Sequence, residues 1–250
     1  MNFSQDDLEI LVKNLDQFGR PLGLKFYPFC IGWYNKKVDA RFHLDYESNT
    51  LAFCVISIPN FFENSFLPYV KNIKKSVNDP FDQCMIYTFK NLKNGLKEEI
   101  DVIHDFELTP NRRPKILVQT AGHVSGAAFY YQKEDVLENP WGKKKIFGVS
   151  CHPWYGGWFG FRGVLIFKNI LTPFLTYREP EDLLSVEQKI QLLDRFNHNW
   201  EDWSFRDVYN MSGEKYSQFQ QDYFQCKPSD RYQLLKNFFE NGDKISNVAS

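Results

Sequence analysis

The sequence lacks the features that would suit a membrane, a metal ion or a disulfide framework. Its longest strongly apolar run, residues 51–58, is far too short to cross a bilayer, so we expect no membrane partner. The five cysteines are widely scattered and form no C-x-x-C pair, which predicts free thiols. No two of the five histidines stand three or four residues apart, so we expect no metal site.

An excess of one charge is missing too. Thirty Lys plus Arg stand against thirty-one Asp plus Glu, which gives a formal net charge of -1 and no general attraction to nucleic acid. The acidic amino terminus has no apolar run of the kind found in signal peptides. Together with free thiols, these features predict a cytoplasmic protein that binds no nucleic acid.

Familiar catalytic motifs are absent, whereas aromatic residues are abundant. The sequence contains no G-x-S-x-G, P-loop or G-x-G-x-x-G motif, which disfavours a hydrolase, a phosphoryl transferase and a Rossmann enzyme. Aromatic residues make up 17%, more than a core of this size needs. Either some of these rings line a cavity for a large flat or apolar ligand, or they form a thickly packed core.

No internal repeat or linker divides the 250 residues, so we expect one domain, over residues 1–242. The patterning predicts an α+β fold with a mixed or antiparallel sheet flanked by helices. A helical C-terminal third follows, with Gly242 as a stop signal and residues 243–250 as a disordered tail.

Cap and turn residues set the expected boundaries of the elements. Ser4, Asp79 and Ser185 are predicted to begin helices. Helices are expected over residues 4–19, 80–100, 115–132, 217–225 and 229–240, and from residue 185 onward. Strands are expected over residues 24–33, 51–58 and 102–108, and a hairpin over residues 145–152 and 158–167.

The arginines are the most informative candidate residues. Arg162 lies in the otherwise apolar run 159–164, where a desolvated guanidinium group must find an anion. That anion is either an internal carboxylate or a bound ligand. Arg206 and Arg231 have more ordinary surroundings, which predict solvated or locally paired charges.

Several local strings together resemble a known family. The longest is PNRRPKIL at residues 110–117, and the rest extend from about residue 27 to residue 231. They include QTA at 119–121, HV at 123–124, GAA at 126–128, YYQ at 130–132, NPWG at 139–142, HP at 152–153, GGWF at 156–159, RG at 162–163, DW at 202–203 and RD at 206–207. On these strings the sequence closely resembles the methylmalonic aciduria and homocystinuria type C family of cobalamin-processing proteins.

The resemblance implies an enzyme that binds cobalamin (vitamin B12) with its base detached and removes the upper axial ligand. Alkylcobalamins would be dealkylated with glutathione as co-substrate, and cyanocobalamin would be decyanated by reduction. The implied fold is similar to that of the flavin nitroreductases, and a flavin, FMN or FAD, stays open as a cofactor. The implied partners are the family's type D adaptor and methionine synthase.

The resemblance also implies site residues. The cobalamin contacts fall on Asp105, Ile116, Leu117, Val118, Gln119, Tyr130, Tyr131, Gln132, Phe147 and Phe161, and Phe147 stands where a small polar residue is expected in relatives. The glutathione site matches Arg162, Arg206 and Arg231. Guanidinium groups suit the two carboxylates of glutathione, and their positive charge favours the thiolate that acts in catalysis.

One histidine deserves separate treatment because of its neighbours. His123-x-x-Gly126 is similar to the Asp-x-His-x-x-Gly motif with which some cobalamin-dependent enzymes place an imidazole on cobalt. In that motif the aspartate orients the histidine, but its position here is Ala121. We therefore expect His123 to be a structural residue and not a cobalt ligand.

Two other classes of function compete with the dealkylase. A flavin-dependent reductase of small molecules would share the implied fold but would have no affinity for corrins. A non-enzymatic B12 chaperone would bind the corrin and leave its upper ligand intact.

Overall fold

The computed structural model describes residues 3–73 and 79–246, and side chains as far as residue 240. Its main sheet has the strand order β1-β2-β6-β3, and β4 pairs with β5 in a second sheet; every pairing is antiparallel. The strands are β1 (Leu24–Cys30), β2 (Thr50–Ser57), β3 (Ile100–His104), β4 (Phe129–Tyr131), β5 (Val149–Cys151) and β6 (Gly160–Leu171). The helices are α1 (Gln5–Gly19), α2 (Ile31–Lys37), α3 (Leu67–Asn72), α4 (Pro80–Gly95), α5 (Val118–Val124), α6 (Val186–Asn199), α7 (Gln218–Gln225) and α8 (Arg231–Ser246).

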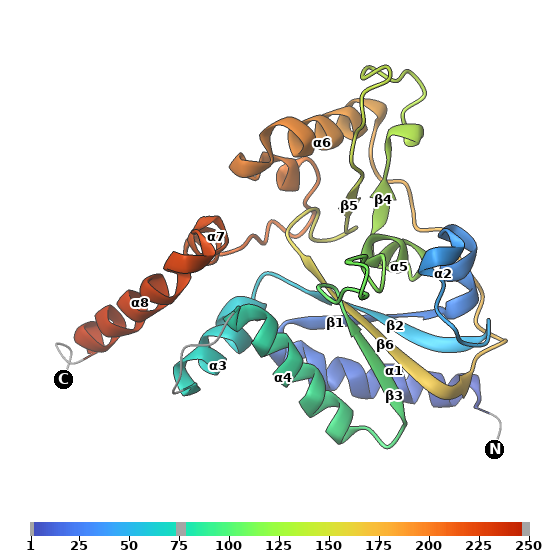
Figure 1. The fold of residues 1–250 in the computed structure, drawn as a ribbon, viewed down its shortest axis with the longest axis horizontal. Coiled ribbons are helices and arrows are strands. Elements are labelled where there is room, and N and C mark those ends of the chain that lie inside the picture. The colour runs from blue at the N-terminus through green and yellow to red at the C-terminus, as the bar shows by residue number, and fades with distance from the viewer. Residues whose placement is uncertain (1–2, 74–78, 247–250) are drawn as a thin grey trace.

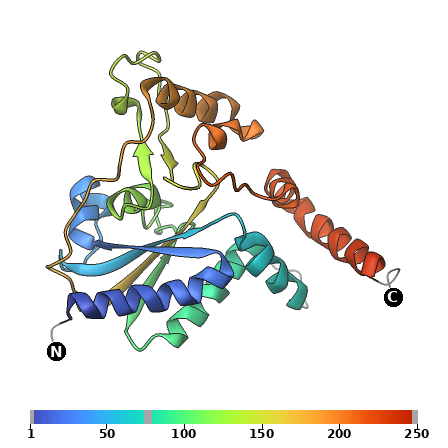
Figure 2. The same ribbon diagram turned by 180° about the vertical axis from the view of Figure 1, so that it is seen from behind.

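The main sheet lies between two helical layers (Figure 1). Successive residues of a strand point to opposite faces, and the buried strand β2 shows this directly. Phe53 and Val55 pack in one hydrophobic cluster with α1 and α4, whereas Cys54 and Ile56 pack in another with α2 and α5. Figure 2 shows α1 lying across its face of the sheet. The predicted α+β fold with an antiparallel sheet is confirmed.

The predicted helix starts are confirmed by their hydrogen bonds. The Ser4 side chain accepts from the Asp7 backbone N–H, and Asp7 bonds back, which completes a capping box. Asp79 accepts from the Asp82 N–H at the start of α4. Ser185 forms a second capping box with the third residue of α6.

Two element boundaries in the first hundred residues, the end of β1 and the end of α4, were predicted wrongly. Residues 31–33 belong to α2 and not to the first strand, which ends at Cys30. The helix from Pro80 ends at Gly95, and Ile100 already begins β3. In both cases the run of apolar residues continues from one element into the next, from β1 into α2 and from α4 into β3. The spacing of apolar residues alone therefore could not locate the boundary.

The long buried helix predicted over residues 115–132 is wrong for most of its length. Only α5 is helical, and Gly126, with a φ of 75°, turns the chain into the left-handed region. The N–H groups of Ala127 and Ala128 then both donate to the Gly122 carbonyl. The chain leaves this turn as β4, because the small residues permit a tight reversal that their helical spacing does not reveal.

The predicted hairpin between residues 145–152 and 158–167 is also wrong. β5 pairs with β4, whereas β6 pairs with β2 and β3. His152 and Gly156 do close a tight turn through two backbone hydrogen bonds. The Gly157 N–H then donates to the Arg206 carbonyl, so a segment distant in the sequence redirects the chain after the turn.

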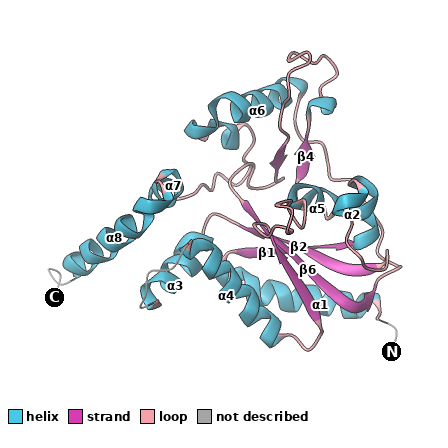
Figure 3. Cartoon of the chain, viewed as in Figure 1, coloured by secondary structure: helices cyan, strands magenta, loops and turns pink. Residues whose placement is uncertain are grey.

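A third hydrophobic cluster, which includes Tyr131, Val149 and Leu193, lies between the small sheet and α6. Beyond α6 the chain leads to α7 and α8, which extend to one side (Figure 3). α8 runs past Gly242 to Ser246, so the predicted stop at Gly242 is wrong, and residues 243–246 of the expected tail are helical. Residues 247–250 of that tail lie outside the described residues.

All five cysteines lie within the described residues and are free, and four of them are buried. Burial raises the pKa of the thiols of Cys54, Cys84 and Cys151 to about 12, which keeps them protonated at neutral pH. Among the described residues, no helix combines the length and apolar character needed to span a bilayer.

Candidate functional site

Arg162 stands near the start of β6 with its guanidinium group partly desolvated. Its Nε donates to the Ser57 hydroxyl on the neighbouring strand at 2.7 Å. The guanidinium carbon lies 4.7 Å from the centre of the Phe81 ring, a cation–π contact from the first turn of α4. Within the described residues no carboxylate forms an ion pair with Arg162, so the internal salt bridge considered from the sequence is not formed.

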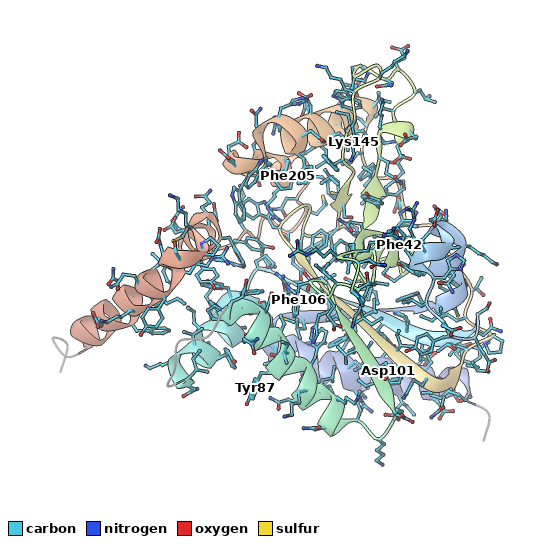
Figure 4. The ribbon with its side chains drawn as sticks, viewed as in Figure 1. Phe42, Tyr87, Asp101, Phe106, Lys145 and Phe205 are labelled. Atoms are coloured by element: carbon cyan, nitrogen blue, oxygen red, sulfur yellow. The ribbon has the colours of Figure 1, made fainter. Side chains whose placement is uncertain are left out.

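Arg206 lies in an aromatic cage formed by Trp158, Trp203, Phe205 and Tyr216. The guanidinium carbon is 4.6 Å from the centre of the Trp203 ring and 5.0 Å from the centre of the Phe205 ring. Phe205 is labelled in Figure 4, below α6. Its hydrogen-bond partners among the described residues are neutral, because it donates to the carbonyls of Gly157 and Phe159. Burial lowers the pKa of Arg206. Arg206 was predicted to be a solvated or locally paired charge; it is buried, and among the described residues it is bonded to backbone carbonyls and not to a carboxylate.

Arg231, at the start of α8, matches the prediction of local pairing. One of its terminal nitrogens lies 3.9 Å from the Asp79 carboxylate. Its guanidinium carbon lies 5.0 Å from the centre of the Tyr223 ring. In the part of the chain that the structure describes, the buried Nε atoms of Arg206 and Arg231 have no hydrogen-bond partner.

The three arginines share one electrostatic neighbourhood although they come from distant segments. The positive charge of Arg162 contributes to the lowered pKa of Arg206. The charges of Arg162 and Arg231 both act on the carboxyl group of Asp82. The arginines thus meet where β6 begins, beside the first turn of α4 and the start of α8.

The residues that the resemblance assigns to cobalamin belong to several parts of the fold, and four of them pack in the cluster with α2 and α5: Ile116, Leu117, Val118 and Phe161. Ile116 is buried and Gln119 is exposed, at the segment that leads into α5. The Leu117 N–H donates to the Tyr34 hydroxyl at 3.0 Å, which fixes this segment on α2. Asp105 follows β3, next to Phe106 (labelled in Figure 4), and burial raises the pKa of its carboxyl group while Arg162 opposes that rise.

Neighbouring tyrosines of β4 point to opposite faces. Tyr131 is 1% exposed, and its hydroxyl accepts from the N–H groups of Leu183 and Leu184. Its ring therefore belongs to the third cluster and is not open to a ligand. Tyr130 faces the other way, and its ring lies against Gly148, where an added Cβ would come within 2.6 Å of the ring.

Three other assigned side chains differ in exposure. Gln132 and Phe147 are exposed, the latter by 58%. The backbone of Phe147 is held by the Asn197 side chain through two hydrogen bonds, of 2.9 and 3.0 Å. Phe161, on β6, is half-buried and packs directly on Gly122 of α5, where there is no room for a Cβ.

Both ring nitrogens of His123 are engaged by the protein. Nδ1 accepts from the Tyr130 N–H at 3.2 Å, so Nε2 carries the proton and donates to the Glu179 carboxylate at 2.8 Å. These bonds support the prediction of a structural role. Glu179 also accepts from the Tyr177 hydroxyl, and these partners lower the pKa of its carboxyl group to about 2.

His152 is a neutral structural histidine in the turn that holds Arg206. Its Nδ1 accepts from the N–H groups of Trp154 and Tyr155, which leaves the proton on Nε2 to be donated to the Tyr27 hydroxyl at 2.7 Å. Burial lowers the pKa of His152 to about 3, so the imidazole stays neutral at physiological pH.

Two hollows flank α1, away from these residues. One, of about 1070 Å³, lies between α1 and the segment after β6 and is lined by residues such as Val12, Arg20 and Phe174. The other, of about 650 Å³, lies between α1 and the end of α4. None of the assigned cobalamin or glutathione residues lines either hollow.

Comparison with known proteins decides the family. The model of the methylmalonic aciduria and homocystinuria type C family matches residues 23–235. The chain belongs to this family. Type C relatives named cyanocobalamin reductase / alkylcobalamin dealkylase include a Gallus gallus protein, 46% identical over 86% of this chain and 91% of the relative. A Danio rerio protein of the same name is 40% identical over 95% of this chain and 97% of the relative.

A solved structure agrees with the type C assignment. The crystal structure of a B12-trafficking protein of C. elegans, CblC, matches with a TM-score of 0.84 at 33% identity. The match covers 93% of this chain and 96% of the C. elegans chain. The fold described above is therefore the fold of that B12-trafficking protein.

The sequence alone did not identify several residues that surround Arg162 and Arg206. The aromatic cage of Arg206 was not foreseen, although the string WSFRD at 203–207 places two of its members, Trp203 and Phe205, next to the arginine. Ser57, which fixes Arg162, carries no recognisable signal. Asp82 was not predicted as a site residue, because its approach to Arg162 and Asp105 depends on the tertiary fold.

Proposed function

We propose that this protein binds cobalamin with its base detached and removes the upper axial ligand in the cytoplasm. The observation that carries the proposal is the cluster of three arginines, of which Arg162 and Arg206 have no internal carboxylate partner among the described residues. Desolvated guanidinium groups with neutral partners favour an anionic ligand. Relatives that carry the dealkylase name at 40–46% identity support the same activity.

Glutathione is the anion that we assign to this cluster. Its two carboxylates suit the guanidinium groups of Arg162, Arg206 and Arg231, and the remaining positive charge favours the thiolate. The thiolate sulfur attacks the alkyl carbon bound to cobalt, the S–C bond forms, and the Co–C electron pair stays on cobalt. The products are a thioether and cob(I)alamin, and the thiol proton passes to solvent.

The aromatic and amide side chains near α5 and β4 would hold the corrin and its detached base. Tyr130 and Phe161 offer flat apolar surfaces, and the exposed Gln119 and Gln132 offer amide groups. Detachment of the base would assist the transfer, because it stabilises the reduced, four-coordinate cobalt that leaves when the alkyl group is transferred. Asp105 lies between this surface and Arg162, at the junction of the two proposed sites.

Decyanation needs an electron in place of a nucleophile. One electron reduces cobalt(III) to cobalt(II), and cyanide leaves with the electron pair of its bond to cobalt. A flavin, FMN or FAD, carries a phosphate, which the guanidinium groups of Arg162 and Arg206 would bind. When bound and reduced, it would supply that electron. The α+β fold with its antiparallel sheet is consistent with a fold similar to that of the flavin nitroreductases. We also propose the type D adaptor and methionine synthase as protein partners.

An anaerobic absorption spectrum with methylcobalamin tests the proposal. Addition of the protein is expected to shift the spectrum to that of the base-detached form, and glutathione is then expected to convert it to cob(I)alamin. Binding without conversion would instead support the chaperone. No spectral change with the corrin, in a protein that carries a bound flavin, would support the small-molecule reductase.

Substitution of Gly122 tests the corrin surface separately. A Cβ at Gly122 would overlap the Phe161 ring, so Gly122→Ala is expected to displace the ring and to weaken methylcobalamin binding about tenfold. Gly95→Ala is the matched control, because a Cβ there meets nothing within 4 Å. Spectroscopic titration measures both dissociation constants, and equal values would remove Phe161 from the corrin site.

A further inference from the structure

Three carboxylates lie near the arginine cluster, and of these Asp79 alone forms an ion pair with a described residue. Asp79 caps α4 and lies 3.9 Å from Arg231. Asp82, in the first turn of the same helix, and Asp105, after β3, are both half-buried. Among the described residues, no side chain donates a hydrogen bond to the Asp82 or Asp105 carboxylate, and none forms an ion pair with either. Asp82 and Asp105 are therefore acidic groups near the arginines that have no cationic partner among the described residues.

The electrostatics of Asp82 agree with this geometry. Burial, together with the charges of Asp79 and Asp105, raises the pKa of the Asp82 carboxyl group to about 6. Arg162 and Arg231 oppose this rise but do not cancel it. Asp82 is therefore mostly ionised at neutral pH, in a place where a further positive charge would be favoured.

A buried hydroxyl group in the same place also lacks a partner. Tyr223 is 0% exposed, and its hydroxyl has no hydrogen-bond partner within the described residues. The guanidinium carbon of Arg231, which pairs with Asp79, lies 5.0 Å from the centre of the Tyr223 ring, so Tyr223 lies beside the acidic cluster. Burial and the charges of Asp79 and Asp82 raise the pKa of the hydroxyl, and the charge of Arg231 opposes that rise. A buried polar group without a partner is unfavourable unless a ligand or water satisfies it.

Glutathione carries one group that arginine cannot bind. Besides its two carboxylates and its thiol, it bears the α-ammonium group of its γ-glutamyl residue. We infer that Asp82, assisted by Asp105 and the Tyr223 hydroxyl, receives this ammonium group and selects glutathione over thiols that lack it. The inference rests on the proposed function, since it assigns a subsite within the proposed glutathione site. Asp82 is thus a specificity residue.

The test compares glutathione with γ-glutaryl-cysteinylglycine, which has hydrogen in place of the amine. Calorimetric titration of each thiol into the protein measures binding without turnover. The wild-type protein is expected to bind glutathione about tenfold more tightly than the analogue. Asp82→Asn is expected to weaken glutathione binding about tenfold and to leave binding of the analogue unchanged.

Asp222→Asn is the control for the lost charge, because Asp222 is exposed on α7 and bonds to Gln218. It is expected to keep the wild-type preference. Equal weakening of both thiols by Asp82→Asn would make Asp82 a structural residue and overturn the inference. The inference would also be overturned if the wild-type protein bound glutathione and the analogue equally tightly, even if it still dealkylated methylcobalamin. Absence of glutathione binding would overturn the inference together with the proposed thiol, whereas amine-selective binding without dealkylation would overturn the proposed activity alone.

Discussion

Arg162→Ala is expected to lower kcat/KM for glutathione about 100-fold in methylcobalamin dealkylation, while the dissociation constant of methylcobalamin stays within about twofold of wild type. A charge-assisted hydrogen bond to a carboxylate contributes about 1.5–3 kcal/mol, which corresponds to roughly 10- to 150-fold. Arg162 is held by Ser57 and Phe81, so its loss removes an anion partner and breaks no internal ion pair of the described residues. Steady-state kinetics at varied glutathione, with a spectroscopic titration of the corrin, measure the two effects.

Lys168→Ala provides the comparison for Arg162. Lys168 stands farther along the same strand and pairs with Glu99 and Asp101 at the surface. The substitution removes one positive charge from β6 without touching the arginine cluster, so wild-type kinetics are expected. If Arg162→Ala weakened corrin and glutathione binding equally, Arg162 would be a structural residue.

Gly156→Ala is expected to lower the free energy of unfolding by more than about 3 kcal/mol. Gly156 has a φ of 59°, and a Cβ there would overlap the carbonyl oxygen of Tyr209. The left-handed conformation costs an alanine roughly 1–2 kcal/mol, and the overlap with backbone adds to this because backbone cannot move aside cheaply. Chemical denaturation followed by circular dichroism measures the change.

Two other glycines distinguish the cost of the left-handed backbone conformation from the cost of the steric overlap at Gly156. Gly126 and Gly213 have φ values of 75° and 69°, and a Cβ at either meets nothing within 4 Å. Their alanine variants are expected to lose only the conformational part, about 1–2 kcal/mol. Equal losses at all three positions would show that the 204–209 segment yields to the added Cβ at Gly156.

Local signals in the sequence located some elements well. The helix starts at Ser4, Asp79 and Ser185 follow from side chains that bond to backbone two or three residues away, and the structure confirms them. The strand β2 follows from a run of β-branched and aromatic residues that is buried on both faces. In each case the information lies within one element.

Long-range contacts account for the failures. The partner of β5 is β4 because the backbone of Gly157 is bonded to Arg206, about fifty residues later. The aromatic cage of Arg206 combines side chains from three separate segments, and no local pattern encodes that meeting. Likewise, the pKa of Asp82 is raised only in the folded protein, where burial and the charges of Asp79 and Asp105 outweigh the opposing charges of Arg162 and Arg231.

The third hydrophobic cluster has a consequence for the cooperativity of the molecule. Its buried members, all from residues 131–205, are separate from those of the clusters on the two faces of the main sheet. We therefore expect the layer of β4, β5 and α6 to open separately from the main sheet, with a free energy below that of global unfolding. A corrin that touches Tyr130 on β4 and Phe161 on β6 would span both layers. Its binding free energy would then add to their docking, so the loaded protein would open as one unit where the free protein opens as two.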